Sequence, residues 1–421
     1  MARKLALALI LTLAATTAMA GETIRVVLGN TSWTEGAVKH IPEFEKETGI
    51  KVKLEIYGED QLSQKLAVEF AAGGGDAIDV LNFRCMQEGK LMVKNGWIQD
   101  LTPFVANDAE YDWMDYTDAA REAATIDGVI TCIPTISETP VIYYRKDIFE
   151  KNGLEPPKTL AEMEEIAKKL TDRKNEFYGF IARGQRSPLV TQFSSYLFSY
   201  GSDFFDRTTG KSLIDTPEFL EAADYYGRML RNYGPDGVLN MSWPQGIAVF
   251  VQGKGAIYLD CSSQYIQLLD PRNSTVADVT GVAMFPAGPR AHKFFFVTAW
   301  GIGIGNQSKN KDAAWKFVRW MTSKEKTMQL QGVQSIQCSR SSAYNDPEGM
   351  KNFPADWAKA VSESLPYGVS YDRPAVTAVG EARDIIGEVV VQSILGQDYK
   401  KAAKEANAKF QTLLDREGLS K

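Results

Sequence analysis

The first part of the chain alternates between two apolar patterns. β-Branched residues dominate residues 22–30, and apolar and polar residues alternate over residues 50–57, so each segment predicts a strand. Residues 77–83 form a third apolar run of strand length. Between these runs, apolar residues recur every three or four positions over residues 38–44 and 62–70, the spacing of an amphipathic helix. This order is typical of a mainly parallel sheet with helices on both faces, and we expect an open α/β domain.

The same alternation returns in the second part of the chain. A capping box at Thr159 and Glu162 predicts the start of one helix, and a proline at the first helical position predicts another at Pro217. Residues 177–182 and 255–260 are apolar runs short enough to be buried strands. A glycine-rich strand, a helix and a mostly helical end follow at residues 298–305, 311–323 and 357–421. We therefore expect a second α/β lobe.

Residues 1–20 have the pattern of a secretory signal peptide. A basic start precedes the apolar run Leu5–Ala15, and Ala18-Met19-Ala20 matches an A-x-A cleavage site, which predicts a mature chain from about Gly21. The run is too short to anchor the protein in a bilayer. The first cysteine is Cys85, so we expect no lipidated N-terminus. The pattern predicts export to a bacterial periplasm.

The length of the chain predicts the number of domains, and its charge indicates which partners it suits. About 400 residues after the signal are more than one core usually holds, which predicts two domains. The formal net charge is −6, and removal of Arg3 and Lys4 with the signal makes it −8. An acidic protein of this kind is poorly suited to nucleic acid or an anionic membrane.

The cysteines and histidines do not predict a metal site. Only two histidines occur, in unrelated contexts, and no C-x-x-C pair is present. Four cysteines in an oxidising compartment are consistent with four buried thiols or with one disulfide, and their spacing does not decide between them. The cysteines are Cys85, Cys132, Cys261 and Cys338.

Five phrases occur in an order that resembles a known family. They are "PEFEKETGIKVKLE", "NGWIQDLTPFV", "VIYYRKDIFEKNGLEPPKTLAEM", "FVQGKGAIYLD" and "GIGIGNQSKNKDAAWKFVRWMTSKE". Together they resemble the family 1 extracellular solute-binding proteins of ABC importers, a group that includes maltose- and multiple-sugar-binding proteins. The resemblance spans nearly the whole chain after the signal. It implies a type II periplasmic-binding-protein fold, in which two α/β lobes are joined by three crossings and close on a ligand.

The resemblance also implies where the chain crosses between lobes. The first crossing is expected at Ile136–Thr139, and Pro134 and Pro140 around it disfavour a helix. No tight-turn dipeptide lies there, which disfavours a plain hairpin. The second crossing is expected near Met284–Ala287 and the third near Gln337–Ser341. Lobe one would then hold residues 21–137 and 287–338, and lobe two residues 138–286 and 339–421.

One position departs from the family pattern. Cys338 stands in the third crossing, where related proteins often have proline. A bridge between Cys132 and Cys338 would tie two crossings together and restrict closure, so the stiffness of the hinge is open.

Side chains at strand ends are the candidates for a ligand site between the lobes. A sugar or polyol needs flat side chains against its C–H face and polar groups for its hydroxyls. The candidates are Asn30, Trp33, Asn82, Arg84, Glu138, Arg183, Tyr200, Gly201, Trp243, Asp260, Ser262, Trp300, Arg340 and Arg373. Trp33 and Trp300 are expected in the cleft because they lie at strand–loop junctions, whereas Trp243 fits cleft and core equally. Arg84 and Arg340 also suit interlobe ion pairs.

The predicted function is the substrate-binding subunit of an ABC importer. A neutral carbohydrate or polyol is the first choice of solute, the permease subunits are the expected partner, and the resemblance implies a monomer with no cofactor or metal. The arginines leave room for a sugar acid such as a uronate, and a polyamine is a further alternative. A secreted carbohydrate-active hydrolase or lyase is the alternative of another class. It needs two carboxylates that flank a bond, and the paired acids here suit solvated loops better.

Overall fold

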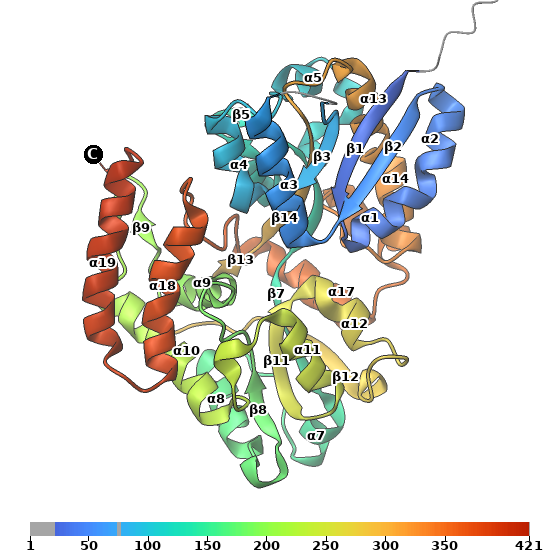
Figure 1. Cartoon of the computed structure of the whole chain (residues 1–421). Coiled ribbons are helices and arrows are strands. Elements are labelled where there is room, and N and C mark those ends of the chain that lie inside the picture. The colour runs from blue at the N-terminus through green and yellow to red at the C-terminus, as the bar shows by residue number, and fades with distance from the viewer. Residues whose placement is uncertain (1–21, 74–76, 421) are drawn as a thin grey trace, which may run out of the picture.

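The computed structural model describes residues 22–73 and 77–420, and it shows two lobes (Figure 1). The signal peptide predicted at residues 1–20 lies outside these ranges. Within them, no helix combines the length and the apolar character needed to cross a membrane.

The sheet of lobe one has five strands in the order β2-β1-β3-β14-β6. β1 pairs in parallel with β2 and β3, as predicted. β14 is antiparallel to both β3 and β6, because the chain enters β14 from the other lobe at the end where β6 leaves. The sheet is therefore mixed rather than mainly parallel. Its strands are β1 (Thr23–Gly29), β2 (Lys51–Tyr57), β3 (Val80–Phe83), β6 (Ile133–Glu138) and β14 (Val297–Ile304).

Helices cover both faces of this sheet, as the alternation of β1 requires. Val26 belongs to the core on one face with Phe44 and Phe317, and Val27 belongs to the core on the other face with Leu66. Lobe one holds α1 (Ser32–Ala37), α2 (Ile41–Thr48), α3 (Glu59–Ala72), α4 (Cys85–Lys94), α5 (Thr102–Ala106), α6 (Asp118–Ala124), α13 (Lys311–Met321) and α14 (Lys324–Met328), and a short hairpin of β4 (Thr125–Ile126) and β5 (Val129–Ile130).

The sheet of lobe two has four strands in the order β12-β7-β11-β8. β7 is antiparallel to both of its neighbours, and β8 is parallel to β11. The strands are β7 (Pro140–Arg145), β8 (Tyr178–Ile181), β11 (Gly255–Cys261) and β12 (Thr280–Met284), and the small pairs are β9 (Phe205–Asp206) with β10 (Lys211–Ser212) and β13 (Phe294–Phe295) with β15 (Gly368–Val369).

The helices of lobe two begin largely where the sequence predicted. Thr159 caps α8 by accepting the N–H of Glu162, and Pro217 is the first residue of α10. The long C-terminal helices α18 and α19 pack on the outer side of this lobe (Figure 1). The helices are α7 (Lys146–Lys151), α8 (Leu160–Leu170), α9 (Leu189–Ser199), α10 (Pro217–Tyr233), α11 (Trp243–Val251), α12 (Tyr265–Leu268), α17 (Ala355–Ser364), α18 (Val379–Ile394) and α19 (Tyr399–Arg416). α15 (Ser341–Asn345) and α16 (Pro347–Met350) precede α17 along the chain.

Three segments pass between the lobes side by side, and we call residues 137–139, 295–298 and 337–339 the crossing seam. Thr139 is the one residue between β6 and β7, and its hydroxyl donates to the carbonyl of Phe295 at 3.2 Å. The N–H of Ser137 donates to the carbonyl of Gln337 at 3.3 Å. The hydroxyl of Ser262 donates to the side-chain oxygen of Gln337 at 2.6 Å. Polar contacts thus connect all three segments.

The second passage lies later in the chain than the sequence predicted. Ala287 pairs with Thr159, and Phe294 and Phe296 are buried in the core of lobe two, so the chain returns to lobe one only at β14. The second crossing was expected near Met284–Ala287, and this prediction was wrong because the buried rings of Phe294 and Phe296 keep the following segment in lobe two. The third passage, residues 337–339, lies within the range Gln337–Ser341 that the sequence predicted. After it, the N–H of Ser342 still donates to Asp115 of lobe one.

The four cysteines are all buried as free thiols. The sulfurs of Cys85 and Cys132 lie 2.8 Å apart. A Cβ at Gly301 would lie 2.3 Å from the sulfur of Cys132, so only glycine fits there. Cys132 and Cys338 belong to the cores on opposite faces of the sheet, and the bridge considered between them is not formed.

Arg340 is a structural residue of lobe one, although its sequence context suggested the cleft. It is fully buried and lies over the rings of Tyr111 and Tyr116. Its guanidinium donates to the carbonyl of Thr322 at 3.0 Å and to the carboxylate of Asp115 at 3.1 Å. The side chain therefore fastens the third passage to lobe one.

We predict that Arg340→Met destabilises the protein. Removal of one partner of a buried ion pair typically lowers the free energy of unfolding by about 3–5 kcal/mol, because the other charge is left unpaired. Arg272→Met is the control, because Arg272 pairs with Asp270 on the surface and its side chain is 87% exposed. Urea denaturation should show a large loss for the first variant and almost none for the second. Equal midpoints would contradict the structural role.

Candidate functional site

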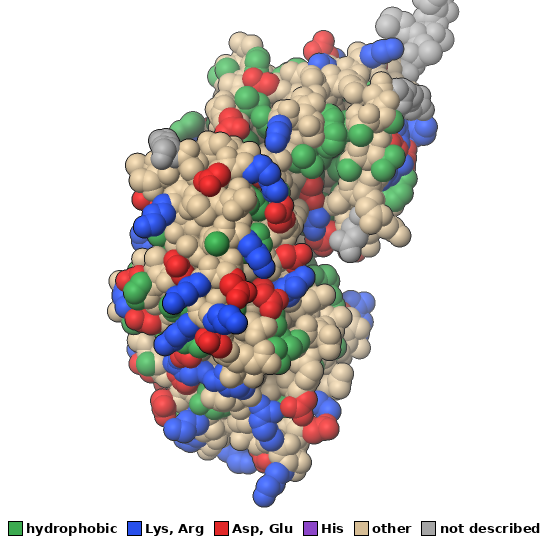
Figure 2. Space-filling model, turned by 60° about the vertical axis from the view of Figure 1, so that its left-hand side comes forward, with side chains coloured by type: hydrophobic (Ala, Val, Ile, Leu, Met, Phe, Trp, Pro, Cys, Tyr) green, Lys and Arg blue, Asp and Glu red, His purple; other side chains and the backbone are tan. Residues whose placement is uncertain are grey.

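A cleft of about 920 Å³ lies between the lobes. Figure 2 shows a notch between the two lobes, with acidic and basic side chains beside it. Lobe one contributes the loop after β1 and the start of β14, and lobe two contributes the start of α9, the start of α11 and the segment before α18. The candidates that line the cleft are Asn30, Arg84, Glu138, Arg183, Trp243, Trp300 and Arg373.

Two tryptophans line the cleft from different lobes. Trp300 stands on β14 and packs over Gly29, where an added Cβ would lie 3.1 Å from two indole carbons. Trp243 is the first residue of α11, which begins at a capping box formed by Ser242 and Gln245. Both indoles are partly exposed, and they offer flat apolar surfaces to a ligand.

Arg183 is held by a buried carboxylate. Its guanidinium donates to both oxygens of Asp260, at 2.9 and 2.5 Å. Tyr258 and Gln192 also donate to Asp260, at 2.9 and 3.0 Å, so the carboxylate is fixed. Burial alone would lower the pKa of Arg183, but Asp260 raises it well above its ordinary value. Asp260 is thus a positioning residue behind the cleft wall rather than part of its lining.

Glu138 lies at the end of β6, within the crossing seam, and accepts a hydrogen bond from the hydroxyl of Ser263. Burial raises the pKa of Glu138, although the bond from Ser263 and the charge of Arg183 lower it. A carboxylate in this place can accept hydrogen bonds from ligand hydroxyls.

Two further arginines of the cleft are also paired. Arg84 bonds to Glu88 at 2.6 Å and also to Glu59. Arg373 bonds to Asp372 at 2.5 Å. Across the cleft, Arg373 donates to the side-chain oxygen of Gln87 on α4 at 2.8 Å, which connects lobe two to lobe one.

Three of the candidate site residues are buried outside the cleft, because of capping and packing contacts that the sequence alone does not show. Thr31 caps α1, so Trp33 lies on the buried face of a helix and is 2% exposed. Asn82 is fully buried and ties β3 to β1 by accepting the N–H of Gly29 at 2.6 Å. Ser262 is buried and donates to Gln337 of the crossing seam.

Tyr200 and Gly201 were placed at the wrong end of a helix. They follow the C-terminal end of α9, where Tyr200 packs near Tyr225 and Gly201 lies beside Arg290. The opposite end of α9 faces the cleft, through residues 187–191.

Sequence reasoning missed several residues of the lining. Two of them had a weak sequence signal for a place in the site. Asp372 adjoins the candidate Arg373, and Arg383 is a charged residue on an otherwise apolar helix face. Without the fold, nothing directs either side chain to the cleft. The missed polar residues are Thr31, Ser32, Glu35, Glu59, Gln185, Ser187, Thr191, Ser242, Ser263, Gln264, Gln267, Thr298, Asp372 and Arg383.

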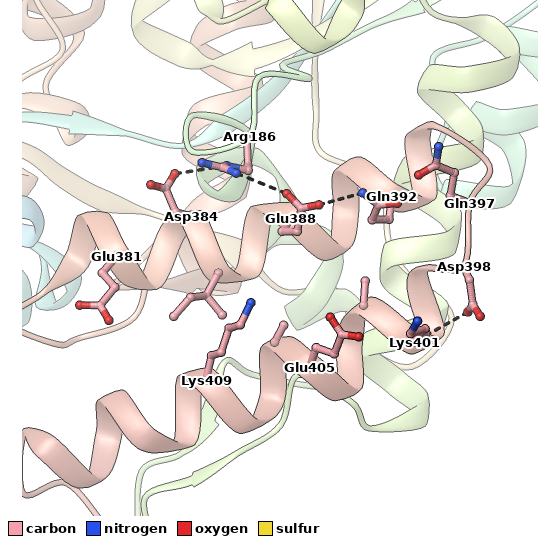
Figure 3. Close-up of a pocket in the computed structure, with 13 residues that line it drawn as sticks. Arg186, Glu381, Asp384, Glu388, Gln392, Gln397, Asp398, Lys401, Glu405 and Lys409 are labelled. Carbon is pink, nitrogen blue, oxygen red and sulfur yellow. Dashed lines mark hydrogen bonds and ion pairs between the residues drawn. The ribbon is translucent and has the colours of Figure 1, made fainter.

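A second hollow of about 930 Å³ lies between α18 and α19, away from the cleft (Figure 3). Arg186 lies there between Asp384 and Glu388, at 3.5 and 3.4 Å. Arg186 lies in the turn before α9, and most other charged side chains of the hollow stand on α18 and α19. Across residues 22–73 and 77–420, no cluster of three or more potential metal ligands occurs.

Comparisons with known proteins give consistent results. The model of the family "Bacterial extracellular solute-binding protein" matches residues 30–328. The mannitol-binding protein of Pseudomonas aeruginosa is 28% identical over 311 residues, which cover 73% of this chain and 68% of that protein. An ABC transporter solute-binding protein from Agrobacterium radiobacter K84, solved in complex with ribitol, has a TM-score of 0.81 at 27% identity, covering 93% of this chain and 99% of that one.

A second solved structure agrees with the first. The solute-binding protein from Agrobacterium vitis S4 with bound D-mannitol has a TM-score of 0.76 at 27% identity, covering 94% of this chain and 98% of that one. These structures confirm the fold class that the sequence predicted.

We predict that Glu138→Gln stabilises the ligand-free protein at neutral pH. Because the pKa of Glu138 is raised in the folded state, its ionised form disfavours folding above that pKa. The melting temperature of the variant should exceed that of the wild type at pH 7, and the difference should shrink as the pH falls toward 4.5, the ordinary carboxyl value. Calorimetry across this range measures it.

Ser263→Ala is the companion variant. It removes a hydrogen bond that lowers the pKa of Glu138, so this pKa should rise further above its ordinary value of 4.5. The stability that is lost as the pH rises above 4.5 should therefore be larger than in the wild type. A Glu138→Gln variant that is less stable than the wild type at every pH would show that the carboxylate is a structural anchor.

Proposed function

Because this chain belongs to the family of bacterial extracellular solute-binding proteins, we propose that it is the substrate-binding subunit of an ABC importer for a sugar, a polyol or a sugar derivative. The observation that carries the proposal is the cleft itself. It places two indoles, Trp243 and Trp300, among carboxylate, amide and hydroxyl groups from both lobes. Relatives with bound ribitol and D-mannitol support the class of solute.

The proposed mechanism is closure of the two lobes on the solute. One face of the sugar or polyol packs on the indoles, and its hydroxyls bond to Glu138, Asn30 and the arginines. A ligand favours the closed state only by contacts that the open state lacks, so residues on both lobes are needed. The closed form then delivers the solute to the permease subunits.

The proposal also covers the cellular location and the oligomeric state of the protein. The protein acts in the periplasm after removal of the signal peptide, without a lipid anchor, as a monomer. It binds its solute without chemical change and needs no cofactor or metal. A secreted hydrolase or lyase is the alternative of another class, and product analysis separates the two.

We predict reversible binding with a Kd in the micromolar range, about −8 kcal/mol. A thermal-shift panel of sugars, polyols and sugar acids should identify a solute that raises the melting temperature, since binding to the folded state alone stabilises it. Calorimetry then gives the affinity, and chromatography of the recovered solute tests for conversion. Recovery of a cleaved or rearranged product would overturn the binding-protein proposal.

We predict that Trp300→Ala and Trp33→Ala separate binding from folding. Loss of the cleft indole should weaken solute affinity by at least ~2 kcal/mol, about thirtyfold. Loss of the buried indole of Trp33 should instead lower the free energy of unfolding by about 3–5 kcal/mol. Calorimetry and urea denaturation of both variants measure these effects. The reverse pattern would show that Trp300 is the core residue.

A further inference from the structure

Arg383 is a cation of the cleft without a carboxylate partner. It stands on α18 and lines the interlobe cleft. Its guanidinium donates to the carbonyl of Ser187 at 3.0 Å and to the side-chain oxygens of Gln87 and Thr191, at 3.3 and 3.4 Å. All three acceptors are neutral. Throughout the part of the chain that the structure describes, no carboxylate oxygen lies within 4.0 Å of its nitrogens.

The other cleft arginines differ in this respect. Arg183, Arg84 and Arg373 each contact a carboxylate, at 2.5, 2.6 and 2.5 Å. On the outer side of lobe two, the half-exposed Arg186 lies between two carboxylates (Figure 3). The absence of a partner at Arg383 is therefore a local feature of the cleft and not a general shortage of acids.

The surroundings of Arg383 are electropositive. Burial, followed by the charges of Arg373, Arg183 and Arg84, lowers the pKa of Arg383 to about 9, although the charge of Asp372 raises it. Both guanidinium groups donate to Gln87, and Asp372 is already paired with Arg373. The first residues of α9 also line this part of the cleft, and a helix N-terminus adds partial positive charge. An anion is thus favoured here.

The remaining donors of Arg383 suit a planar anion. A guanidinium has five N–H groups, and the contacts above use three of them, one on each nitrogen. One N–H of each terminal nitrogen remains, and a carboxylate has two oxygens that can accept such groups. A single uncompensated cation also matches a group with one negative charge better than a phosphate monoester, which carries more than one.

We propose that the solute is an acidic sugar derivative, a uronic or aldonic acid, whose carboxylate binds to Arg383 beside Arg373. This inference rests on the proposed function and specifies the class of its solute. The carboxylate takes the partner position that the protein leaves empty, and the hydroxyls of the solute remain for Glu138 and the indoles. A neutral polyol would leave the guanidinium uncompensated in the closed cleft.

The test compares matched pairs of neutral and acidic solutes by calorimetry on the full mature protein. The pairs are galactose with galacturonate, glucose with glucuronate, mannitol with mannonate, and ribitol with ribonate. At least one acid should bind ten times or more tightly than its neutral partner, and this preference should weaken at high salt. Neutral solutes that bind as tightly as every acid would overturn the inference and leave the proposed function intact. Binding by neither member of any pair would overturn both.

The variant Arg383→Gln tests whether Arg383 causes the preference for acidic solutes. It should lower the affinity for the acid at least ten times more than it lowers the affinity for the neutral partner. Arg186→Gln is the matched control, because it removes a guanidinium from the same lobe outside the cleft, and it should leave the preference unchanged. The melting temperature of ligand-free Arg383→Gln should not fall, since the lost charge was uncompensated. An acid preference that survives in a folded Arg383→Gln variant would overturn the assignment.

Discussion

The hydrogen bonds of the crossing seam are the constraint on which the rest of this structure depends. Each lobe has its own sheet and core, and a single residue, Thr139, separates β6 of one sheet from β7 of the other. Backbone polar groups at such a junction cannot join either ladder fully and must find other partners. Thr139 exchanges bonds with Ser262, and Ser137 bonds to Ser339 at 2.8 Å. These contacts align the passages and place the cleft directly beside them.

The arginines of the cleft differ in whether a carboxylate neutralises their charge. A buried guanidinium is stable when a fixed carboxylate lies behind it, and Asp260 does this for Arg183 through a network of donors. Such pairs give rigid, oriented N–H groups without excess charge. Where the carboxylate is missing, as at Arg383, the cleft keeps a positive potential. In the proposed function, paired and unpaired arginines therefore have different roles: the paired ones orient the solute, and Arg383 selects its charge.

The sequence predicted the two lobes because strand and helix periodicities are local properties. Trp300 and Glu138 could be placed near the cleft because both lie where a strand meets a crossing. Trp33 was misplaced because a side-chain cap, rather than hydrophobic spacing, turns its helix toward the core. Arg340 has a cleft-like sequence context, yet its partners Asp115 and Tyr111 lie more than two hundred residues earlier in the chain. Arg383 was missed because only the packing of α18 brings it to the cleft.

The contact between the lobes through Gln87 bears on how long a solute stays bound. This amide oxygen accepts hydrogen bonds from two arginines of the opposite lobe. A glutamate in the same place would form charge-assisted bonds, which are roughly twice as strong as neutral ones. The lobes would then hold together even without a solute, and dissociation would slow. Because the amide oxygen of Gln87 is neutral, the closed form depends on the bound solute for its stability. The residence time of the solute is then set by its own contacts with the two lobes, and the permease can still remove it.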